Sequence, residues 1–307
     1  MSKVDLHIHS KYSGDGELPV SRILEMCISA GMKLVSITDH NSVRSVIEAL
    51  QGRAGRNTGN EEEDEIEIIP GVELDCIYKG INIHLLGYGI DHTCKEFYEI
   101  EKDILFQEKE AGEKRIHLFQ KTTGIPLNST EILNVANGGI VTGELIGEHA
   151  LAKDNAENYD VLKTYLPGGE KSDMPFVRIY WDFFAPEKPA YVPVHYITLQ
   201  DAISLIRNSN GIAVLAHPGQ TLSGNHSLLN DIIPEGIDGI EVYSSYHSAE
   251  DASCFLSTAR ENKLLVSCGS DFHGKAKPAI KIGDHGSLLD DKEIMSMFQI
   301  KRMGEKK

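Results

Sequence analysis

The sequence predicts an α/β fold built on a parallel sheet, and three observations lead to this prediction. Segments with the pattern of β-strands alternate with segments that have the pattern of α-helices. Strands such as "IAVLA" (212–216) are apolar throughout, which is typical of strands buried on both faces of a parallel sheet. Histidines and carboxylates fall where several of these strands end, and in barrels of alternating strands and helices that edge carries the active site.

The first part of the chain alternates strands and helices. Pro19 and Gly31 flank the first predicted helix, as is typical of proline in the first turn and glycine just past the end. The stretch 52–65 is polar, glycine-rich and acidic, and it is interpreted as a loop. The strands are expected at 3–10, 33–40, 66–74 and 81–89, and the helices at 18–31 and 42–51.

A long middle segment interrupts this alternation. Residues 93–190 carry few strand signals, and helices are expected at 96–124 and 143–155. The segment is interpreted as a mostly helical insertion domain with a role in substrate recognition. Residues 1–92 plus 191–307 then form the domain that carries the predicted strands and the candidate ligands.

Alternation resumes in the last part of the chain. Thr198 with Asp201, and Ser248 with Asp251, have the spacing of capping boxes that open helices. The strands are expected at 212–219, 237–247 and 264–274, and the helices at 198–211 and 248–263.

Composition excludes several classes of protein. The formal net charge of −16 disfavours a protein that holds duplex nucleic acid through many phosphate contacts, and an excess of carboxylates suits one that holds cations. No apolar run approaches the roughly 20 residues that span a bilayer, so no membrane partner is expected. The first residues lack a signal-peptide core, and the five cysteines form no C-x-x-C pair, so a cytoplasmic protein with reduced thiols is expected.

Histidines and carboxylates form the strongest functional pattern. His7 and His9 are two residues apart in a predicted strand, so both side chains should point to the same face. Imidazole and carboxylate ligands suit zinc, manganese or iron, and nine of them could hold three ions if one carboxylate bridges. We therefore expect two to three divalent ions (Mn, Zn or Fe) at His7, His9, Asp15, His40, Glu73, His84, His217, Asp271 and His273.

Five motifs carry a family resemblance. In order they are "DLHIHSKYSGDGEL", "ITDHNS", "IPGVEL", "LAHPG" and "GSDFHG". Together they resemble the PHP (polymerase and histidinol phosphatase) family of metal-dependent phosphoesterases. The middle segment, with "KPAYVPVHYITLQDAISLI" after it, is similar to the subgroup that contains a nucleotide-phosphatase insertion. The resemblance implies a distorted seven-stranded (β/α) barrel with a three-metal centre.

The resemblance also implies how the ligands are shared. One metal would take His7, His9, Glu73 and Asp271. A second would share Glu73 and take His84 and His217, and the third would take Asp15, His40 and His273. Asp15 departs from the pattern, because "SGDG" carries an extra Gly14 compared with the commoner "SDG".

The expected reaction is attack of a metal-bound hydroxide on the phosphorus of a small nucleotide or sugar phosphate. Glu73 and Asp271 would serve it through the metals, and His247 is a candidate for protonating the leaving group. Arg178, among aromatics in "MPFVRIYWDFF", and His195 are candidates for binding the substrate, although Arg178 could equally be a surface residue of a core segment. Lys275 and Lys277, in "FHGKAKP", could attract phosphate, but they are interpreted as solvated residues of a loop.

The substrate stays open at the level of sequence. Related nucleotide phosphatases tend to carry "GRPHIA" where this chain has "TGELIGEHALA", which disfavours a nucleotide with two phosphates. Some relatives with this insertion open a cyclic phosphate of a sugar and then remove the monoester. The sequence is also compatible with an oligonucleotide exonuclease and with a non-catalytic metal-binding module, and the oligomeric state is left open.

Overall fold

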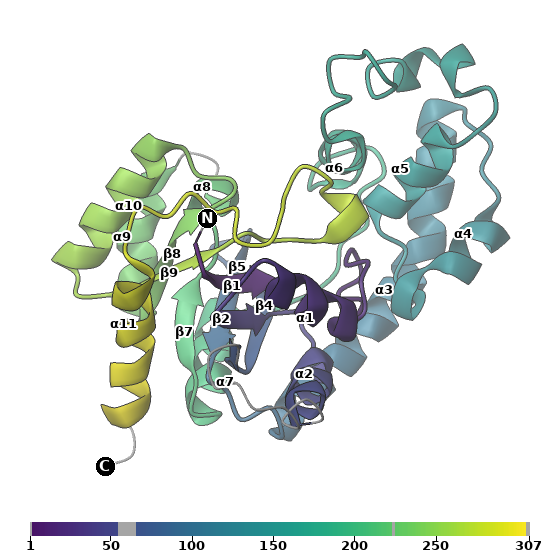
Figure 1. The fold of residues 1–307 in the computed structure, drawn as a ribbon. Coiled ribbons are helices and arrows are strands. Elements are labelled where there is room, and N and C mark those ends of the chain that lie inside the picture. Colours follow the sequence, from purple (N-terminus) through teal and green to yellow (C-terminus); the bar gives the residue numbers. More distant parts are fainter. Residues whose placement is uncertain (1, 55–65, 223–224, 305–307) are drawn as a thin grey trace.

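The computed structural model of the protein describes residues 2–54, 66–222 and 225–304, and it shows a mixed α/β fold (Figure 1). Most of the predicted loop at 52–65 lies outside the described residues. The strands gather in one part of the molecule, and helices from the middle of the chain form a second lobe beside it.

The strands form two sheets. Three parallel strands make the smaller sheet, in the order β1 (Val4–Ile8), β2 (Leu34–Ile37) and β3 (Glu67–Ile68). The larger sheet has six strands in the order β6 (Ile197–Thr198), β4 (Gly71–Tyr78), β5 (Ile81–Tyr88), β7 (Ile212–Leu215), β8 (Gly239–Ser244) and β9 (Leu265–Gly269). The prediction of one seven-stranded barrel is therefore not confirmed.

The expectation of a parallel sheet is wrong at β5, which runs antiparallel to both β4 and β7. Only Lys79 and Gly80 separate β4 from β5, and both have positive φ, of 49° and 80°. Two such residues make the tight turn whose twist matches a hairpin, so the chain folds back beside itself instead of crossing over through a helix.

Pro70 divides the strand predicted at 66–74. The proline has no N–H to donate to a sheet, and the segment splits into β3 before it and β4 after it. Glu73 is consequently the third residue of β4 instead of lying near a strand end.

The edges of the two sheets meet at single bridges. Ile8 pairs with Phe272 beside β1 and β9, and His40 pairs with Glu73 beside β2 and β4. Backbone hydrogen bonds strengthen the first junction, because Asp271 N–H donates to the His7 carbonyl at 2.8 Å. Residues that follow β1, β2 and β9 are thereby brought next to the start of β4.

Helices surround the sheets and bury their apolar faces against them. The Ser248–Asp251 capping box forms in full, and the Thr198 side chain accepts a hydrogen bond from the Asp201 N–H at 3.1 Å. Phe255 and Phe298 are fully buried in the core beneath two of these helices. The helices are α1 (Val20–Ser29), α2 (Arg44–Ala54), α7 (Leu199–Asn208), α8 (Pro218–Thr221), α9 (Leu229–Ile232), α10 (Ala249–Glu261) and α11 (Asp291–Gly304).

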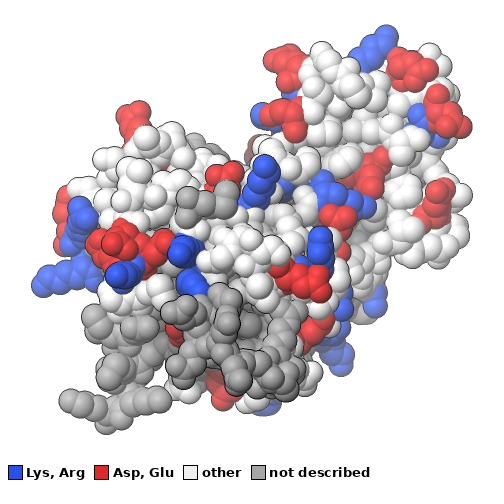
Figure 2. All heavy atoms as spheres, viewed as in Figure 1, with Lys and Arg blue, Asp and Glu red and all other residues white. Residues whose placement is uncertain are grey.

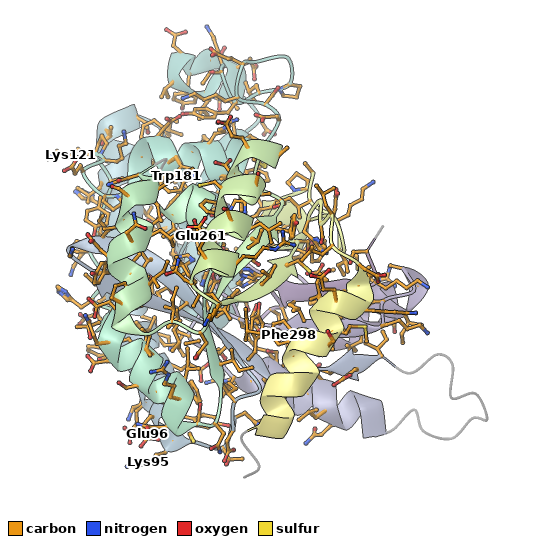
Figure 3. The ribbon with its side chains drawn as sticks, turned by 90° about the vertical axis from the view of Figure 1, so that its left-hand side faces the viewer. Lys95, Glu96, Lys121, Trp181, Glu261 and Phe298 are labelled. Atoms are coloured by element: carbon orange, nitrogen blue, oxygen red, sulfur yellow. The ribbon has the colours of Figure 1, made fainter. Side chains whose placement is uncertain are left out.

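The middle of the chain is helical where helices were expected. Its helices are α3 (Lys95–Thr123), α4 (Ser129–Val135), α5 (Gly143–Leu151) and α6 (Pro175–Ile179), the last followed by a π-helical turn at Tyr180–Phe184. Lys95 and Lys121, near opposite ends of α3, show how far this helix extends along the molecule (Figure 3). Phe119, Ile146 and Ile179 belong to an apolar cluster separate from the core under the sheets. The domain boundaries at 93–190 stay a prediction.

Among the described helices, none combines the length and the apolar character needed to cross a membrane.

Candidate metal centre

The nine side chains singled out in the sequence lie together at the junction of the two sheets. Their ligand atoms fall into three overlapping groups, in each of which the atoms lie within 4.8 Å of one another. The groups are His7, His9, Glu73 and Asp271; His9, Asp15, His40 and His273; and His40, Glu73 and His84. His217 joins them through Glu73, whose Oε1 is 3.1 Å from its Nε2. We call these nine side chains the metal cluster.

Glu73 is the centre of the cluster. The bridge between His40 and Glu73 in the backbone places this carboxylate, fully buried, where the two sheets meet. Both of its oxygens face imidazoles, so it is placed to bridge two cations. Oε1 lies 3.0 Å from His84 Nδ1 and 3.1 Å from His217 Nε2, while Oε2 lies 3.1 Å from His7 Nε2, 3.1 Å from His9 Nε2 and 3.3 Å from His40 Nδ1.

Two aspartates complete the cluster from the loops after β1 and β9. Asp271 Oδ1 lies 3.0 Å from His9 Nε2, and Asp15 Oδ2 lies 3.1 Å from His273 Nε2. Asp15 reaches this position although the loop carries the additional Gly14. A side chain at Gly16 would meet the Ser10 carbonyl oxygen at 1.9 Å, so the tight path of this loop requires glycine there.

Several buried atoms of the cluster have no hydrogen-bond partner. They are His9 Nε2, His40 Nδ1, His273 Nε2 and Asp15 Oδ1; the three nitrogens lie 3.0, 3.3 and 3.1 Å from carboxylate oxygens of the cluster, but without the geometry of a hydrogen bond. Leaving a buried polar atom unpaired costs about 1–3 kcal/mol, and four such atoms converge on one place. Cations would satisfy all four, and the set of imidazoles and carboxylates without thiolates fits zinc, manganese or iron. The residues present therefore fit a centre of more than one divalent cation.

Residues around the cluster fix which ring nitrogen four of its six histidines turn inward. Glu241 Oε1 lies 3.0 Å from His7 Nδ1, which leaves Nε2 facing Glu73 and Asp271. Asp75 binds His84 Nε2 at 2.9 Å and leaves Nδ1 inward. Such partners orient metal-binding imidazoles and set their tautomer. Ser13 and Thr221 do the same for other ligands, each 2.9 Å from an Nδ1, of His9 and His217 respectively.

The sequence pattern does not assign a role to these outer residues. Glu241 stands near the end of a predicted strand, and Asp75 follows the strand that carries Glu73. One signal for Asp75 is available, because it is two residues after Glu73 and so on the same face of a strand. No local signal links Glu241 to His7, since 234 residues separate them.

The ionisation of the cluster follows from burial and mutual attraction. Burial raises the pKa of Glu73, but His7, His40 and His84 outweigh this and hold the pKa well below its usual range. Burial lowers the pKa of His9, yet Asp271 and Glu73 raise it to about 9. Burial dominates at His273 and lowers its pKa to about 4. Without cations the cluster thus retains protons, which cation binding would displace.

Two predicted substrate-binding residues lie outside the cluster. Arg178 on α6 is 48% exposed and pairs with Asp173 at 3.2 Å. His195 is exposed, and its backbone bonds to the side chain of Gln107 on α3. Their roles in binding substrate stay predictions.

His247 hydrogen-bonds to the backbone through both of its ring nitrogens. Its Nδ1 donates to the Val242 carbonyl at 2.8 Å, and its Nε2 accepts from the Gly219 N–H at 3.1 Å. The two hydrogen bonds hold the turn that follows His217. The role of His247 in protonating the leaving group stays a prediction.

Side chains of α5 approach the cluster from the helical lobe. Burial, followed by repulsion from Asp15, raises the pKa of Glu144 from 4.5 to about 7. One turn further along, Glu148 forms an ion pair with Lys275 at 2.8 Å and so connects α5 to the loop after β9. The wall that α5 presents to the cluster therefore carries the carboxylates of Glu144 and of the paired Glu148, and α5 itself supplies no lysine or arginine.

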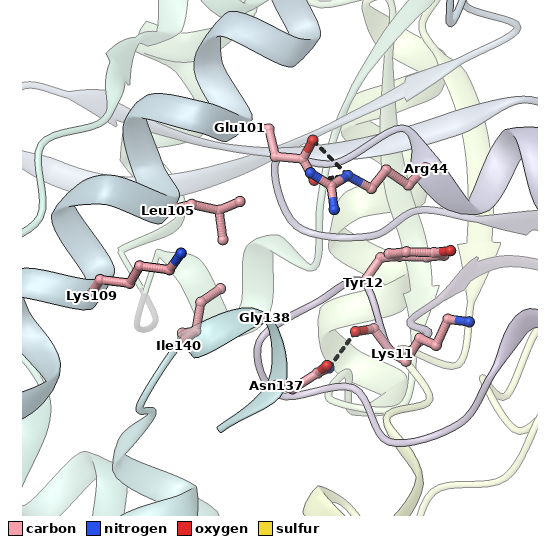
Figure 4. Close-up of a pocket in the computed structure, with 9 residues that line it drawn as sticks. All are labelled: Lys11, Tyr12, Arg44, Glu101, Leu105, Lys109, Asn137, Gly138 and Ile140. Carbon is pink, nitrogen blue, oxygen red and sulfur yellow. Dashed lines mark hydrogen bonds and ion pairs between the residues drawn. The ribbon is translucent and has the colours of Figure 1, made fainter. Parts of the chain in front are cut away.

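A hollow of about 360 Å³ marks another junction between the two lobes (Figure 4). Arg44 at the start of α2 pairs there with Glu101 on α3 at 3.0 Å. The Asn137 side chain, from a 3₁₀ turn, donates to the backbone carbonyls of Lys11 and of Ser13, the latter at 3.1 Å. None of the nine cluster residues lines this hollow, so it belongs to the joint between the lobes.

The chain is similar to one protein family and, over most of its length, to several individual proteins. The PHP domain family matches residues 5–163. A 3',5'-nucleoside bisphosphate phosphatase of Chromobacterium violaceum is 28% identical, over 92% of this chain and 91% of its own length. The 5'-3' exoribonuclease Rnm of Salmonella typhimurium is 29% identical, over 91% of this chain and 87% of its own.

Two further proteins are similar over nearly the whole chain. A phosphoribosyl 1,2-cyclic phosphate 1,2-diphosphodiesterase of Eggerthella lenta is 24% identical, over 88% of this chain and 94% of its own. Among solved structures, a predicted metal-dependent phosphoesterase of Bifidobacterium adolescentis superposes with a TM-score of 0.74 at 21% identity, covering 97% of this chain and 96% of its own. The second likeness shows that the two proteins share a fold.

Proposed function

The chain belongs to the PHP domain family, and we propose that it is a metal-dependent phosphoesterase that hydrolyses a small phosphorylated nucleotide or sugar phosphate. The observation that carries the proposal is the metal cluster, in which nine imidazole and carboxylate side chains converge around buried Glu73. Four buried ligand atoms without hydrogen-bond partners support it, because cations would satisfy them.

Each part of the cluster has a distinct task in this proposal. Divalent cations bound there would lower the pKa of water and neutralise charge on the phosphoryl oxygens. Glu73 would hold two of the cations at a fixed separation through its two oxygens, and Asp271 would bind with Oδ1. Glu241 and Asp75 would keep His7 and His84 in the tautomers that ligation needs.

The carboxylates of the α5 wall favour one class of substrate over another. The helix "GELIGEHAL" contains no lysine or arginine, and Glu144 lies close enough to Asp15 for the two carboxylates to repel. Such a wall does not favour a second phosphate, whereas carboxylates accept hydrogen bonds from sugar hydroxyls. A cyclic phosphate of a sugar, opened and then hydrolysed as a monoester, is therefore the second candidate.

The net charge of the protein also favours a small substrate over a long nucleic acid. Acidic and basic side chains are interspersed over the face seen in Figure 2, and the chain carries a formal charge of −16. A long nucleic acid would need a continuous basic surface. A small substrate held mainly by the cations has no such requirement.

A substrate panel tests this proposal. The protein loaded with Mn²⁺ is offered phosphate monoesters, cyclic phosphates of sugars, nucleoside bisphosphates and short oligonucleotides, and product is followed by chromatography and phosphate release. We expect turnover of monoesters or cyclic phosphates to exceed that of bisphosphates. Hydrolysis of none of them by fully loaded protein would favour the non-catalytic metal-binding module, and preference for oligonucleotides would favour the exonuclease.

Recognition by Arg178 is the remaining part of the proposal. The two lobes meet beside the cluster, and an arginine of the helical lobe can bind a substrate group that lies beyond the metals. Arg178→Ala should keep its metal content and lower kcat/KM on the preferred substrate by about 2–4 kcal/mol of transition-state binding. p-Nitrophenyl phosphate should be affected much less. Equal losses on both substrates, or none on either, would contradict this role.

A further inference from the structure

Two lysines of one loop have different environments. Lys275 and Lys277 follow β9, and the sequence predicts both to be solvated. The structure confirms this for Lys275, whose side chain is 55% exposed in its ion pair with Glu148. The prediction is wrong for Lys277, whose side chain is only 13% exposed and whose ammonium lies at the metal cluster.

Lys277 binds the outer oxygen of Asp271. Its Nζ lies 2.6 Å from Asp271 Oδ2, and the Tyr246 hydroxyl donates to the same oxygen at 2.7 Å. The ammonium also lies 5.1 Å from the centre of the Tyr246 ring, where a cation is attracted to the aromatic face. Lysine and tyrosine thus act on one atom from two directions.

The other oxygen of Asp271 faces the opposite way. Oδ1 lies 3.0 Å from His9 Nε2 and 3.3 Å from His7 Nε2, inside the metal cluster. The carboxylate is therefore divided, with one oxygen inside the cluster and the other bound by Lys277 and Tyr246. A free carboxylate can bind a metal through one oxygen or through both.

We infer that Lys277, together with Tyr246, is a positioning residue that withholds Oδ2 from the metals and makes Asp271 a ligand through one oxygen only. The inference rests on the proposed metal centre. A cation that gains one ligand atom from Asp271 instead of two retains a coordination position for water or substrate, as catalytic sites require. The hydrogen bonds to Oδ2 also fix the plane of the carboxylate, so Oδ1 is held in place.

Cobalt provides a readout that does not depend on a substrate. Metal-free protein is reconstituted with Co²⁺, whose visible absorption reports coordination number and geometry. Lys277→Met removes the ammonium but keeps an unbranched apolar chain, so Oδ2 becomes free to bind the metal. We expect a changed cobalt spectrum, because the metal gains a ligand atom, and a fall of about 10–100-fold in kcat, the range typical of outer residues of metal sites. KM on p-nitrophenyl phosphate should stay the same.

Matched variants serve as controls. Lys281→Met makes the same substitution four residues further on, at an exposed lysine, and should leave the spectrum and kcat as in the wild type. Lys277→Arg keeps the positive charge, so its cobalt spectrum should stay close to that of the wild type. Tyr246→Phe removes only one of the two donors and should shift the spectrum in the same direction as Lys277→Met, which keeps the inference testable if Lys277→Met does not fold.

Two outcomes would overturn the inference. If Lys277→Met keeps the wild-type cobalt spectrum and kcat but raises KM, Lys277 binds the substrate and does not position Asp271. If spectrum and kinetics both match the wild type, it has neither role. A changed spectrum in a protein that hydrolyses no phosphate ester would support the inference and reject the proposed function, so the two can fail separately.

Discussion

At the scale of single residues, the histidines of the metal cluster differ mainly in what binds their second nitrogen. Glu241, Ser13, Thr221 and Asp75 each hold one ring, so the nitrogen that faces the cluster is fixed before any cation arrives. Ligands oriented in this way lose little freedom on binding, which favours affinity and a defined geometry.

Glu73 is the residue whose loss should cost most. Its two oxygens contact five histidines, so Glu73→Gln removes the charge that balances the cations and one possible bridging oxygen. We expect loss of bound metal by elemental analysis and a fall in turnover of more than about 100-fold, beyond the range typical of outer residues.

The matched control is His226→Gln, which changes a partly exposed histidine outside the cluster. The Nε2 atom of His226 lies 3.5 Å from Asp251 Oδ1. The metal content and turnover of this variant should stay at the level of the wild type. Similar losses in the Glu73 and His226 variants would show that the cluster has been assigned to the wrong residues.

Glu144 should give stability a defined pH dependence. Its folded pKa of about 7 is raised above the ordinary 4.5, so its contribution is fully present below pH 4.5 and is lost as pH rises through 7. Glu144→Gln should therefore become more stable than the wild type between pH 5 and pH 8, by up to about 3 kcal/mol at the upper end.

Chelated protein is the proper sample for this comparison, because bound cations would themselves favour the charged carboxylate. Urea unfolding at pH 5 and pH 8 measures the difference. Glu148→Gln, on the same helix with a side chain 35% exposed, controls for removing a charge from α5. A free energy of unfolding that favours the wild type increasingly as pH rises would contradict a raised pKa at Glu144.

At the scale of elements, a 3₁₀ turn of the helical lobe holds the loop that carries Asp15. The Asn137 side chain donates to the carbonyls of Lys11, of Ser13 at 3.1 Å and of Gly16 at 3.4 Å. Asn137→Ala would leave these carbonyls without that donor and loosen the loop. We expect a loss of about 1–2 kcal/mol of unfolding free energy and weaker binding of one cation per chain.

Calorimetric titration of metal into the apo variant measures this effect, with Asn128→Ala as a control. Asn128 caps α4 through the Glu131 N–H, so its loss should lower stability without changing metal binding. If Asn137→Ala binds the full complement of cations with unchanged affinity, the turn does not support the metal cluster.

At the scale of the whole molecule, the metal cluster joins the two sheets. Its ligands come from β1, from the loops after β1, β2, β7 and β9, and from both strands of the β4–β5 hairpin. Cations that bind only this folded arrangement raise its free energy of unfolding by RT ln(1 + [L]/Kd), where [L] is the free cation concentration and Kd its dissociation constant. This amounts to about 2.7 kcal/mol when the cation concentration is a hundred times Kd.

Chelation should therefore lower the thermal midpoint by several degrees, and adding Mn²⁺ or Zn²⁺ back should restore it. Calorimetry with and without chelator measures the shift, and elemental analysis confirms that the metal has been removed. An unchanged midpoint in protein shown to be free of metal would mean that no cation binds at the junction.

The sequence alone determined most of the elements and which side chains could gather in the metal cluster. Local signals were sufficient there, because a period of two places His7 and His9 on one face, the capping residues Thr198 and Ser248 mark the starts of helices, and several of the nine side chains follow directly after a strand. The residues that make up each of these signals are only a few positions apart in the sequence. Even the extra Gly14, which departs from the family pattern, left Asp15 within reach of His273.

Tertiary structure decided whatever depends on contacts between distant segments. Glu241 reaches His7 across 234 residues, and nothing local marks that pair. Lys277 resembles Lys275 in the sequence, yet packing against Tyr246 and Asp271 buries one while the other stays exposed. The exposure of Arg178 likewise depends on how α6 packs. The direction of β5, in contrast, follows from the local turn at Lys79 and Gly80, a signal that the sequence analysis missed. Burial and pairing depend on the whole fold, so residues of one type can acquire different roles.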